Sequence, residues 1–542
     1  MTKEIKIYDT TLRDGAQAEG IAFTVEDKLK IATKLDELGV HYIEGGWPGS
    51  NPKDIEFFER VKGHKWMHAK LAAFGSTCRA GTAASKDPLL QQLVESGAPV
   101  ITIFGKSWDY HVTKVLRTTL EENLRMIRDS VAFLKSTGRE VIFDAEHFFD
   151  GYRANPDYTV ATLQAALEGG ADAVVLCDTN GGSLPWQVED AVRAVVQKLT
   201  CPVGIHAHND SELAVANSIA AVKAGATHVQ GTMNGWGERV GNANLCSIIP
   251  SLQIKMGYQC LPPDKLAQLT DASLYVYEIA NIPPLERQPY VGRSAFAHKA
   301  GMHVDAVMKS PSTFEHIDPA LVGNSRRFLI SEQSGGSAIR VKAREFGIDL
   351  DKGSPEARAI LEQVVRLENE GYVFEGAEAS FELLVRKVLG TYKKLFDLKG
   401  FRVIVEKRGH DAEVVTEATL KVAVDGEECL TVAEGDGPVH ALDGAMRKAL
   451  LHFYPELADI RLTDFKVRVV NVKEGTAAKV RVLVESSAHE DSWSTIGVST
   501  NIIEASWQAL VDAVEYGLTR HQRMRQASAQ KSRQENQQAD EQ

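Results

Sequence analysis

The chain has 542 residues, too many for one hydrophobic core, and so predicts several domains. Its 61 basic and 73 acidic residues give a net charge of -12 without a long basic block, which argues against nucleic acid as a partner and favours small molecules. Six cysteines without CxxC spacing are typical of reduced thiols, and no apolar stretch reaches the length of a membrane span. We therefore expect a soluble cytoplasmic protein with no membrane partner.

Between residues 4 and 257, short apolar runs alternate with longer amphipathic stretches. Parallel strands covered by helices have this pattern, and eight strands close a (β/α)8 TIM barrel, with an open sheet as the alternative. Thr24 and Asp27 form a candidate capping box for the first helix. The predicted barrel covers residues 1–260, and its strands are IKIYDTT, HYIEGG, KLAAFG, VITIFG, EVIFDAE, AVVLCDT, VGIHAH and HVQGTM.

The rest of the chain predicts two further kinds of structure, so that the whole protein is of the α/β class. Residues 261–400 lose the strand periodicity and predict helical linker subdomains with proline-rich breaks. Residues 401–520 contain a strand-then-helix order twice, which predicts an α+β domain with pseudo-duplicated units. Residues 521–542 lack apolar anchors and predict a disordered tail.

His206 and His208 stand two positions apart on the seventh predicted strand, so both side chains point to the same side. They could bind a metal ion, or they could be two hydrogen-bonded histidines at the barrel mouth. Other polar residues also follow the strands, and the carboxyl ends of barrel strands meet at one rim. Each of these polar residues also has a structural explanation, as a turn former, a helix cap or part of an ion pair that ties loops together. The residues are Asp9, Arg13, Asp14, Gln17, Glu44, Asp144, Glu146, Asp178, Thr179, Asn180, Glu238, Arg239 and Asn242.

A carboxylate and two neutral imidazoles suit a divalent metal ion with open positions, which a 2-keto acid could fill. Asp14 is the carboxylate we choose to complete the set with His206 and His208. Its neighbour Arg13 carries a permanent charge that could offset the oxyanion formed when a ketone is attacked. The ligand types do not distinguish Mn²⁺, Mg²⁺, Zn²⁺ and Co²⁺.

Four motifs in this order, YDTTLRDGAQ, CDTNGG, HAHND and GERVGNAN, carry a family resemblance. The chain resembles the metal-dependent Claisen-condensing acyltransferases, which are the 2-isopropylmalate, homocitrate and citramalate synthases. The resemblance continues through AFAHKAGMHVDAV to GVSTNIIEASWQAL, and the segments AQAEGIAF and GGWPGSNPKD are most similar to the citramalate branch. It implies condensation of acetyl-CoA with pyruvate and water to (R)-citramalate and CoA, the first step of a threonine-independent isoleucine route.

The resemblance also implies roles for individual residues. It places Asp14, His206 and His208 on the metal ion, with Asn242 close to it or as a weaker ligand. It makes Arg13 the group that polarises the keto oxygen. It implies that Thr179 holds the keto-acid carboxylate and that Glu146 takes part in proton transfer. His303, from this or the partner subunit, would be a second acid/base group. Gln17 and Glu44 would contact the substrate or support the residues that do.

Two positions depart from the family pattern. Phe314 stands where many relatives have a tyrosine, so it cannot supply a hydroxyl. Lys106 follows the fourth strand in a segment unlike that of related synthases, where it could contact an anion or be a solvated loop lysine.

The C-terminal domain resembles the family's allosteric module, which implies a homodimer and isoleucine as the effector. Glycine-containing turns precede its two predicted helices, and they could receive a carboxylate or simply be tight turns. Other functions stay open: a 2-isopropylmalate or homocitrate synthase acting on a larger 2-keto acid, or a non-catalytic amino-acid sensor. A related lyase is disfavoured by the extra C-terminal domain.

Overall fold

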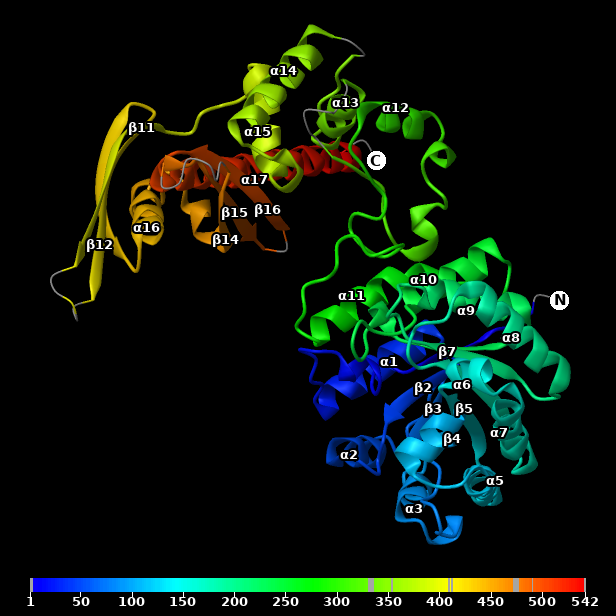
Figure 1. Ribbon diagram of the computed structural model, residues 1–542. Helices are drawn as coiled ribbons and strands as arrows, with labels where there is room; N and C mark the ends of the chain where they lie inside the picture. The colour runs from blue at the N-terminus through cyan, green and yellow to red at the C-terminus, as the bar shows by residue number, and fades with distance from the viewer. Residues whose placement is uncertain are drawn as a thin grey trace. The chain divides into compact units, whose positions relative to one another are not determined.

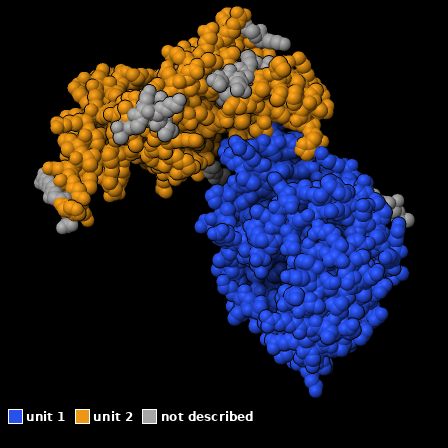
Figure 2. Space-filling model, in the orientation of Figure 1, with its two compact units in different colours: residues 1–296, 317–326 blue, residues 297–316, 327–542 orange. Residues whose placement is uncertain are grey.

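The computed structural model describes residues 3–329, 336–351, 354–407, 410, 413–470, 477–489 and 491–540. The chain divides into two compact units, one of residues 1–296 with 317–326 and one of residues 297–316 with 327–542. Figure 1 labels the helices and strands, and Figure 2 colours the two units. The finer division at residues 260, 400 and 520 stays a prediction.

Eight parallel strands in the first unit form a closed barrel in chain order, and β1 pairs with β8 to complete it. The predicted TIM barrel is therefore confirmed, and the open sheet is excluded. The strands are β1 (Lys6–Asp9), β2 (Tyr42–Gly46), β3 (Lys70–Ser76), β4 (Val100–Lys106), β5 (Glu140–Glu146), β6 (Ala173–Asp178), β7 (Val203–Ala207) and β8 (His228–Gly231).

Helices follow the strands and cover the outside of the barrel (Figure 1). The predicted capping box is present, because Thr24 Oγ1 accepts from the Asp27 amide while the Asp27 carboxylate accepts from the Thr24 amide. The helices of this unit are α1 (Val25–Leu38), α2 (Pro52–Arg60), α3 (Pro88–Glu95), α4 (Asp109–His111), α5 (Leu120–Ser136), α6 (Phe148–Ala154), α7 (Pro156–Glu168), α8 (Pro185–Lys198), α9 (Ala214–Ala224), α10 (Leu245–Pro250) and α11 (Leu269–Ile279).

Strand residues alternate between two apolar clusters, because successive side chains of a strand point to opposite faces. Ile7 and Ile43 belong to the large cluster that also contains helix residues, so they face outward to the helices. Tyr8, Tyr42 and Val175 belong to a small cluster made of strand residues alone, so they fill the barrel interior. The same alternation decides which polar residues of each strand face inward.

His228, the first residue of β8, lies among the interior aromatic rings. Its ring centroid is 5.4 Å from that of Tyr8 and 5.6 Å from that of Tyr42. The side chain is buried, and its Nε2 has no hydrogen-bond partner among the described residues. Burial disfavours the charged imidazolium and lowers the pKa of His228 to about 3.

We predict that His228 makes the barrel sensitive to acid. The unfolded chain takes up a proton on this histidine below pH 6.5 while the folded chain does not, so stability present above pH 6.5 is lost as the pH falls toward 3, about 2 kcal/mol of it by pH 5. His228→Gln should lose less stability than the parent chain between pH 7 and pH 5, measured by urea unfolding. The exposed control His64→Gln should follow the parent chain, and equal pH dependence of His228→Gln and the parent would contradict the prediction.

The second unit contains a helical part and two antiparallel sheets, each followed by a helix. The predicted strand-then-helix duplication is confirmed, including the β12–β13 hairpin that turns at Asp425 and Gly426. Its elements are β9 (Ala297–His298), α12 (Gly301–Lys309), β10 (Arg327–Phe328), α13 (Gly336–Glu345), α14 (Pro355–Glu370), α15 (Glu378–Val388), β11 (Asp397–Lys407), β12 (Val414–Val424), β13 (Glu427–Gly435), α16 (Pro438–Leu450), β14 (Arg461–Val469), β15 (Val480–Ala488), β16 (Asp491–Ser499) and α17 (Ile502–Asp540).

Helix α17 differs from the expected end of the chain. It continues to Asp540, through residues for which the sequence predicts a disordered tail. This segment contains neither glycine nor proline and is rich in glutamine, alanine and arginine, which favour helix even without apolar anchors.

Among the described residues, no helix combines the length and apolar character needed to cross a membrane.

Candidate metal centre

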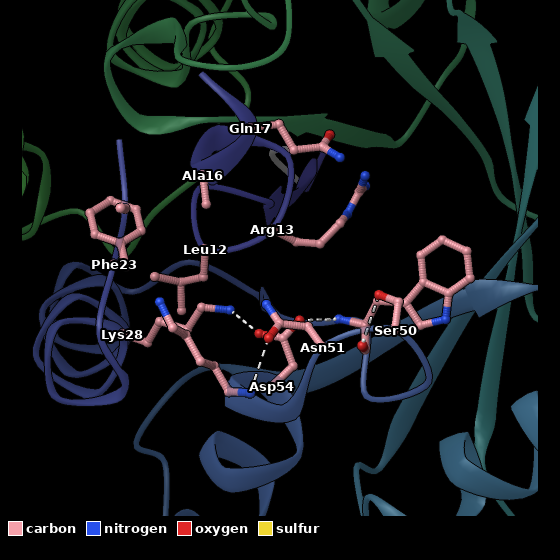
Figure 3. A pocket seen from close by; sticks show the side chains of 12 residues that line it. Leu12, Arg13, Ala16, Gln17, Phe23, Lys28, Ser50, Asn51 and Asp54 are labelled. Carbon is pink, nitrogen blue, oxygen red and sulfur yellow. Dashed lines mark hydrogen bonds and ion pairs between the residues drawn. The ribbon is translucent and has the colours of Figure 1, made fainter. Parts of the chain in front are cut away.

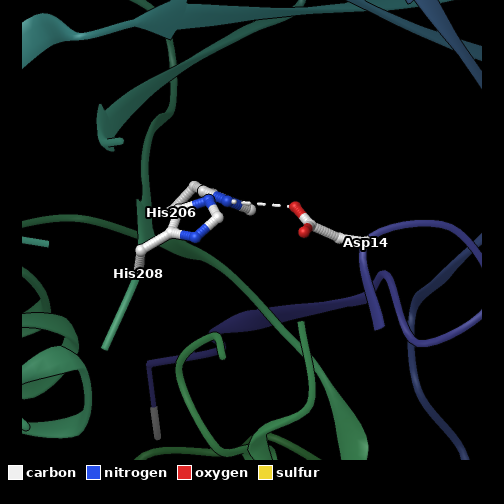
Figure 4. Close-up of side chains that lie close together, drawn as sticks. All are labelled: Asp14, His206 and His208. Atoms are coloured by element: carbon white, nitrogen blue, oxygen red, sulfur yellow. Dashed lines mark ion pairs between the residues drawn. The ribbon is translucent and has the colours of Figure 1, made fainter. Parts of the chain in front are cut away.

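Asp14, His206 and His208 come together at the carboxyl end of the barrel strands (Figure 4). One potential ligand atom from each residue lies within 4.8 Å of the others, and all three side chains are buried. His206 Nε2 is 3.5 Å from Asp14 Oδ2. Asp14 follows β1, and the histidines lie at the end of β7, so closure of the barrel brings residues almost 200 positions apart into one cluster.

Asn242 lies beside this cluster. Its backbone forms an isolated bridge with His208, and the side chain is buried. Three buried atoms in this group have no hydrogen-bond partner among the described residues: Asp14 Oδ1, His208 Nδ1 and Asn242 Oδ1. Buried polar atoms without partners are costly, and a cation ligated by these atoms would satisfy them. The residues therefore fit a divalent metal ion.

The electrostatics of the cluster favour the ligand forms of its residues. Burial by itself raises the pKa of Asp14, but the charges of Arg13, His206 and His208 outweigh it and hold the pKa at about 2. Burial lowers the pKa of His208 to about 4, and it also lowers the pKa of His206. At neutral pH the site thus offers a carboxylate and two neutral imidazoles, the forms that bind metal ions.

Arg13 is held beside the cluster by several partners. Its Nε donates to Glu44 Oε1 at 2.6 Å, its Nη1 lies 3.3 Å from Asp14 Oδ2, and its guanidinium carbon lies 3.7 Å from the centre of the Phe74 ring. Burial disfavours the charge, yet Glu44 and Asp14 more than compensate and raise the pKa of Arg13. The guanidinium is therefore a fixed, permanent charge next to the metal ligands.

Glu44 is fully buried, and its carboxylate accepts three hydrogen bonds. Besides Arg13, the hydroxyls of Tyr8 and Thr10 donate to it at 2.6 and 2.5 Å. Of the two roles left open for Glu44, support rather than direct substrate contact is the one that these contacts favour. Gln17 is exposed instead, and it lines a cavity of about 260 Å³ together with Arg13, in which both side chains extend in the same direction (Figure 3).

Glu146 and Lys106 form an ion pair at the ends of β5 and β4. The Lys106 ammonium also lies 5.3 Å from the centre of the Phe104 ring, so the side chain is not a freely solvated loop lysine. Thr179 lies at the end of β6, where its hydroxyl oxygen accepts from the His147 amide at 2.8 Å. The hydroxyl hydrogen of Thr179 thus remains available to donate to a ligand.

His303 lies on α12 in the second compact unit, where its ring stacks on Phe314 with centroids 4.0 Å apart. The metal-ligand candidates and Arg13 all lie in the first compact unit. His303 belongs to the second unit.

Arg239 has a structural role. Its guanidinium pairs with Asp210 at 2.7 and 2.8 Å and donates to the Thr179 carbonyl at 2.9 Å. These contacts tie together the loops after β6, β7 and β8. The loop-tying explanation that the sequence left open for this arginine is the one that the structure supports.

Several residues around the cluster were not singled out by the sequence patterns, namely Tyr8, Thr10, Phe74 and Gln230. Each lies on or directly after a strand, within otherwise apolar or turn-like runs. The alternation of side chains along each strand could have identified them as facing the barrel interior. It could not have identified the residues that they contact.

Comparison with known proteins identifies the family of the chain. Residues 4–276 match the HMGL-like family, residues 290–371 match the homocitrate synthase post-HMGL domain-like family, and residues 375–518 match the LeuA allosteric (dimerisation) domain. The chain is 56% identical to the (R)-citramalate synthase of Geobacter sulfurreducens over 95% of this chain and 97% of the relative. It is 54% identical to that of Aquifex aeolicus over 96% and 98%. The chain belongs to the (R)-citramalate synthase family.

The more distant 2-isopropylmalate synthase of Methanocaldococcus jannaschii is 30% identical over 96% of both chains. Within the (R)-citramalate synthase family, the match extends over both compact units, including the C-terminal module. The protein is therefore an enzyme of the acyl-transferring type.

We predict that Asp14→Asn weakens metal binding by about tenfold or more, because the substitution keeps the shape of the ligand and removes its charge. Isothermal titration of the full chain with Mn²⁺ measures the effect. Asp210→Asn, which alters a loop carboxylate paired with Arg239, is the matched control and should bind Mn²⁺ like the parent chain. Equal affinity of Asp14→Asn and the parent chain would remove Asp14 from the ligand set.

Proposed function

We propose that the protein condenses acetyl-CoA with pyruvate and water to give (R)-citramalate and CoA, and that the residues of the candidate metal centre carry the reaction. The observation that carries the proposal is the buried cluster of Asp14, His206 and His208 beside the fixed charge of Arg13. The identities of 48–56% to five (R)-citramalate synthases support pyruvate over a larger 2-keto acid.

Asp14, His206 and His208 would hold a divalent metal ion, with Asn242 Oδ1 as a nearby or weaker ligand. When bound, the ion supplies Lewis-acid polarisation of a keto group and orients the keto acid through its two oxygens. Mn²⁺, Mg²⁺, Zn²⁺ and Co²⁺ all suit this ligand set.

Arg13 stabilises the negative charge that develops on the keto oxygen of pyruvate as the new carbon–carbon bond forms. Its guanidinium is already desolvated and oriented by Glu44, so little reorganisation is needed during the reaction. Thr179 donates its free hydroxyl hydrogen to the pyruvate carboxylate. Gln17 lines the neighbouring cavity and contacts substrate there.

Proton transfer requires a base for the methyl group of acetyl-CoA and an acid for the new hydroxyl. Glu146 takes part in this transfer, and the ammonium of Lys106 beside it keeps a positive charge next to the carboxylate. His303 is the second acid/base group, supplied by this subunit or its partner. The methyl carbon, once deprotonated, attacks the keto carbon of pyruvate, the resulting alkoxide takes up a proton, and water hydrolyses the thioester to release CoA.

The C-terminal module supports a regulatory proposal. Residues 375–518 match a module named for allostery and dimerisation, and we propose that the protein is a homodimer inhibited by isoleucine, the end product of the route. A cytoplasmic location completes the proposal, since the six cysteines are all free in the structure.

We predict that the purified protein releases CoA from acetyl-CoA with pyruvate, measured with a thiol reagent, and that chelation abolishes the release until Mn²⁺ is restored. The parallel reaction with 2-ketoisovalerate should be much slower. Equal or faster turnover of 2-ketoisovalerate would favour a 2-isopropylmalate synthase. No turnover with any 2-keto acid would favour the amino-acid sensor.

A second prediction concerns regulation. Isoleucine should inhibit CoA release by the full chain, while a chain ending before β11 at residue 397, if it folds and turns over, should not respond. Binding of isoleucine to the full chain, measured by calorimetry, separates the effector site from catalysis. Binding and inhibition by another amino acid in place of isoleucine would overturn the assignment.

A further inference from the structure

A chain of hydrogen bonds crosses the barrel interior behind His206. Gln230 Oε1 lies 2.9 Å from His206 Nδ1, and Gln230 Nε2 donates to Asp144 Oδ1 at 3.0 Å. The three residues come from β7, β8 and β5, and all three side chains are buried. The strand register places Ile205 opposite Val229, so the next residue of each strand, His206 and Gln230, also lie side by side.

Asp144 determines how the amide of Gln230 is oriented. An amide has a donor end and an acceptor end, and in the structure the donor end, Nε2, donates to Asp144 Oδ1. The acceptor end, Oε1, must then face His206. Turning the amide around would place its NH₂ group against His206 Nδ1 and its oxygen against Asp144 Oδ1, and both contacts would then require His206 Nδ1 to accept and the Asp144 carboxyl group to donate.

The orientation of the amide in turn selects the tautomer of His206. Because Oε1 can only accept, His206 Nδ1 carries the hydrogen and donates it to Gln230. The lone pair is then on Nε2, the atom that lies 3.5 Å from Asp14 Oδ2 and faces the cluster. His208 differs, since its Nδ1 has no partner among the described residues.

We propose that Gln230 is a positioning residue for the metal centre, and that Asp144 acts through it. The Asp144–Gln230 pair holds His206 in the tautomer whose Nε2 can bind a metal ion, and it prevents rotation of the ring. Such an outer contact to a metal-binding histidine raises metal affinity by about 10–100-fold in other proteins. The inference rests on the proposed metal site, and it adds two residues to which the proposed reaction gives no role.

The test measures Mn²⁺ affinity by calorimetry on the full-length chain, so it does not depend on turnover. Gln230→Met keeps the length of the side chain but removes the amide, and it should weaken Mn²⁺ binding about 10–100-fold. Gln230→Glu keeps an acceptor for the Nδ1 hydrogen and should retain affinity close to that of the parent chain. His228→Gln, on the same strand at the opposite end, is the control for general loss of packing and should bind Mn²⁺ normally.

Asp144→Leu tests the second step. If Asp144 acts through Gln230, this substitution should weaken Mn²⁺ binding several-fold in the parent chain and have no further effect when Gln230→Met is already present. Equal weakening in both backgrounds would refute the relay. Circular dichroism of each variant identifies those that do not fold, and if Gln230→Met does not fold, Gln230→Leu takes its place in both tests.

Two outcomes would overturn the proposal for Gln230 itself: unchanged affinity of Gln230→Met, or equal losses for Gln230→Met and Gln230→Glu, which would indicate a packing role. Absence of Mn²⁺ binding by the parent chain would instead overturn the metal site of the proposed function. The two failures are thus distinguishable.

Discussion

The rest of the site depends on one electrostatic constraint, a carboxylate buried against two imidazoles at the mouth of a closed barrel. Asp14 cannot remain ionised there without positive charge nearby, because desolvation favours its neutral form. Arg13 supplies part of that charge, and Glu44 in turn compensates Arg13. The atoms that remain without partners, Asp14 Oδ1 among them, are those that a divalent cation would satisfy.

Two polar networks in the barrel interior orient the residues around Asp14. The hydroxyls of Tyr8 and Thr10 converge on Glu44 and thereby fix Arg13, while Asp144 and Gln230 fix His206. Each network joins different strands of the barrel, and each is buried, so its members have little freedom to rearrange. The permanent charge and the metal ligand are therefore oriented before any substrate arrives, the condition under which electrostatic stabilisation of a transition state costs least.

The second unit has a different construction, in which two three-stranded antiparallel sheets share one apolar core with helices α16 and α17. The repeated order of strands and helix could be predicted from the sequence because each repeat is a continuous segment of the chain. The continuation of α17 could not, because the prediction of disorder relied on missing apolar anchors, whereas helix propensity alone favours the observed helix.

The sequence by itself determined the number of barrel strands, the shared face of His206 and His208, and the candidate carboxylate Asp14, because strand periodicity and residue chemistry are local properties. It did not determine that Lys106 pairs with Glu146, that Tyr8 donates to Glu44, or that Gln230 bridges His206 and Asp144. Those contacts join residues 24 to 86 positions apart, and they depend on barrel closure and strand register. Only the tertiary structure determines barrel closure and register, because the alternation of side chains along a strand shows which way a side chain points but not which residue it contacts.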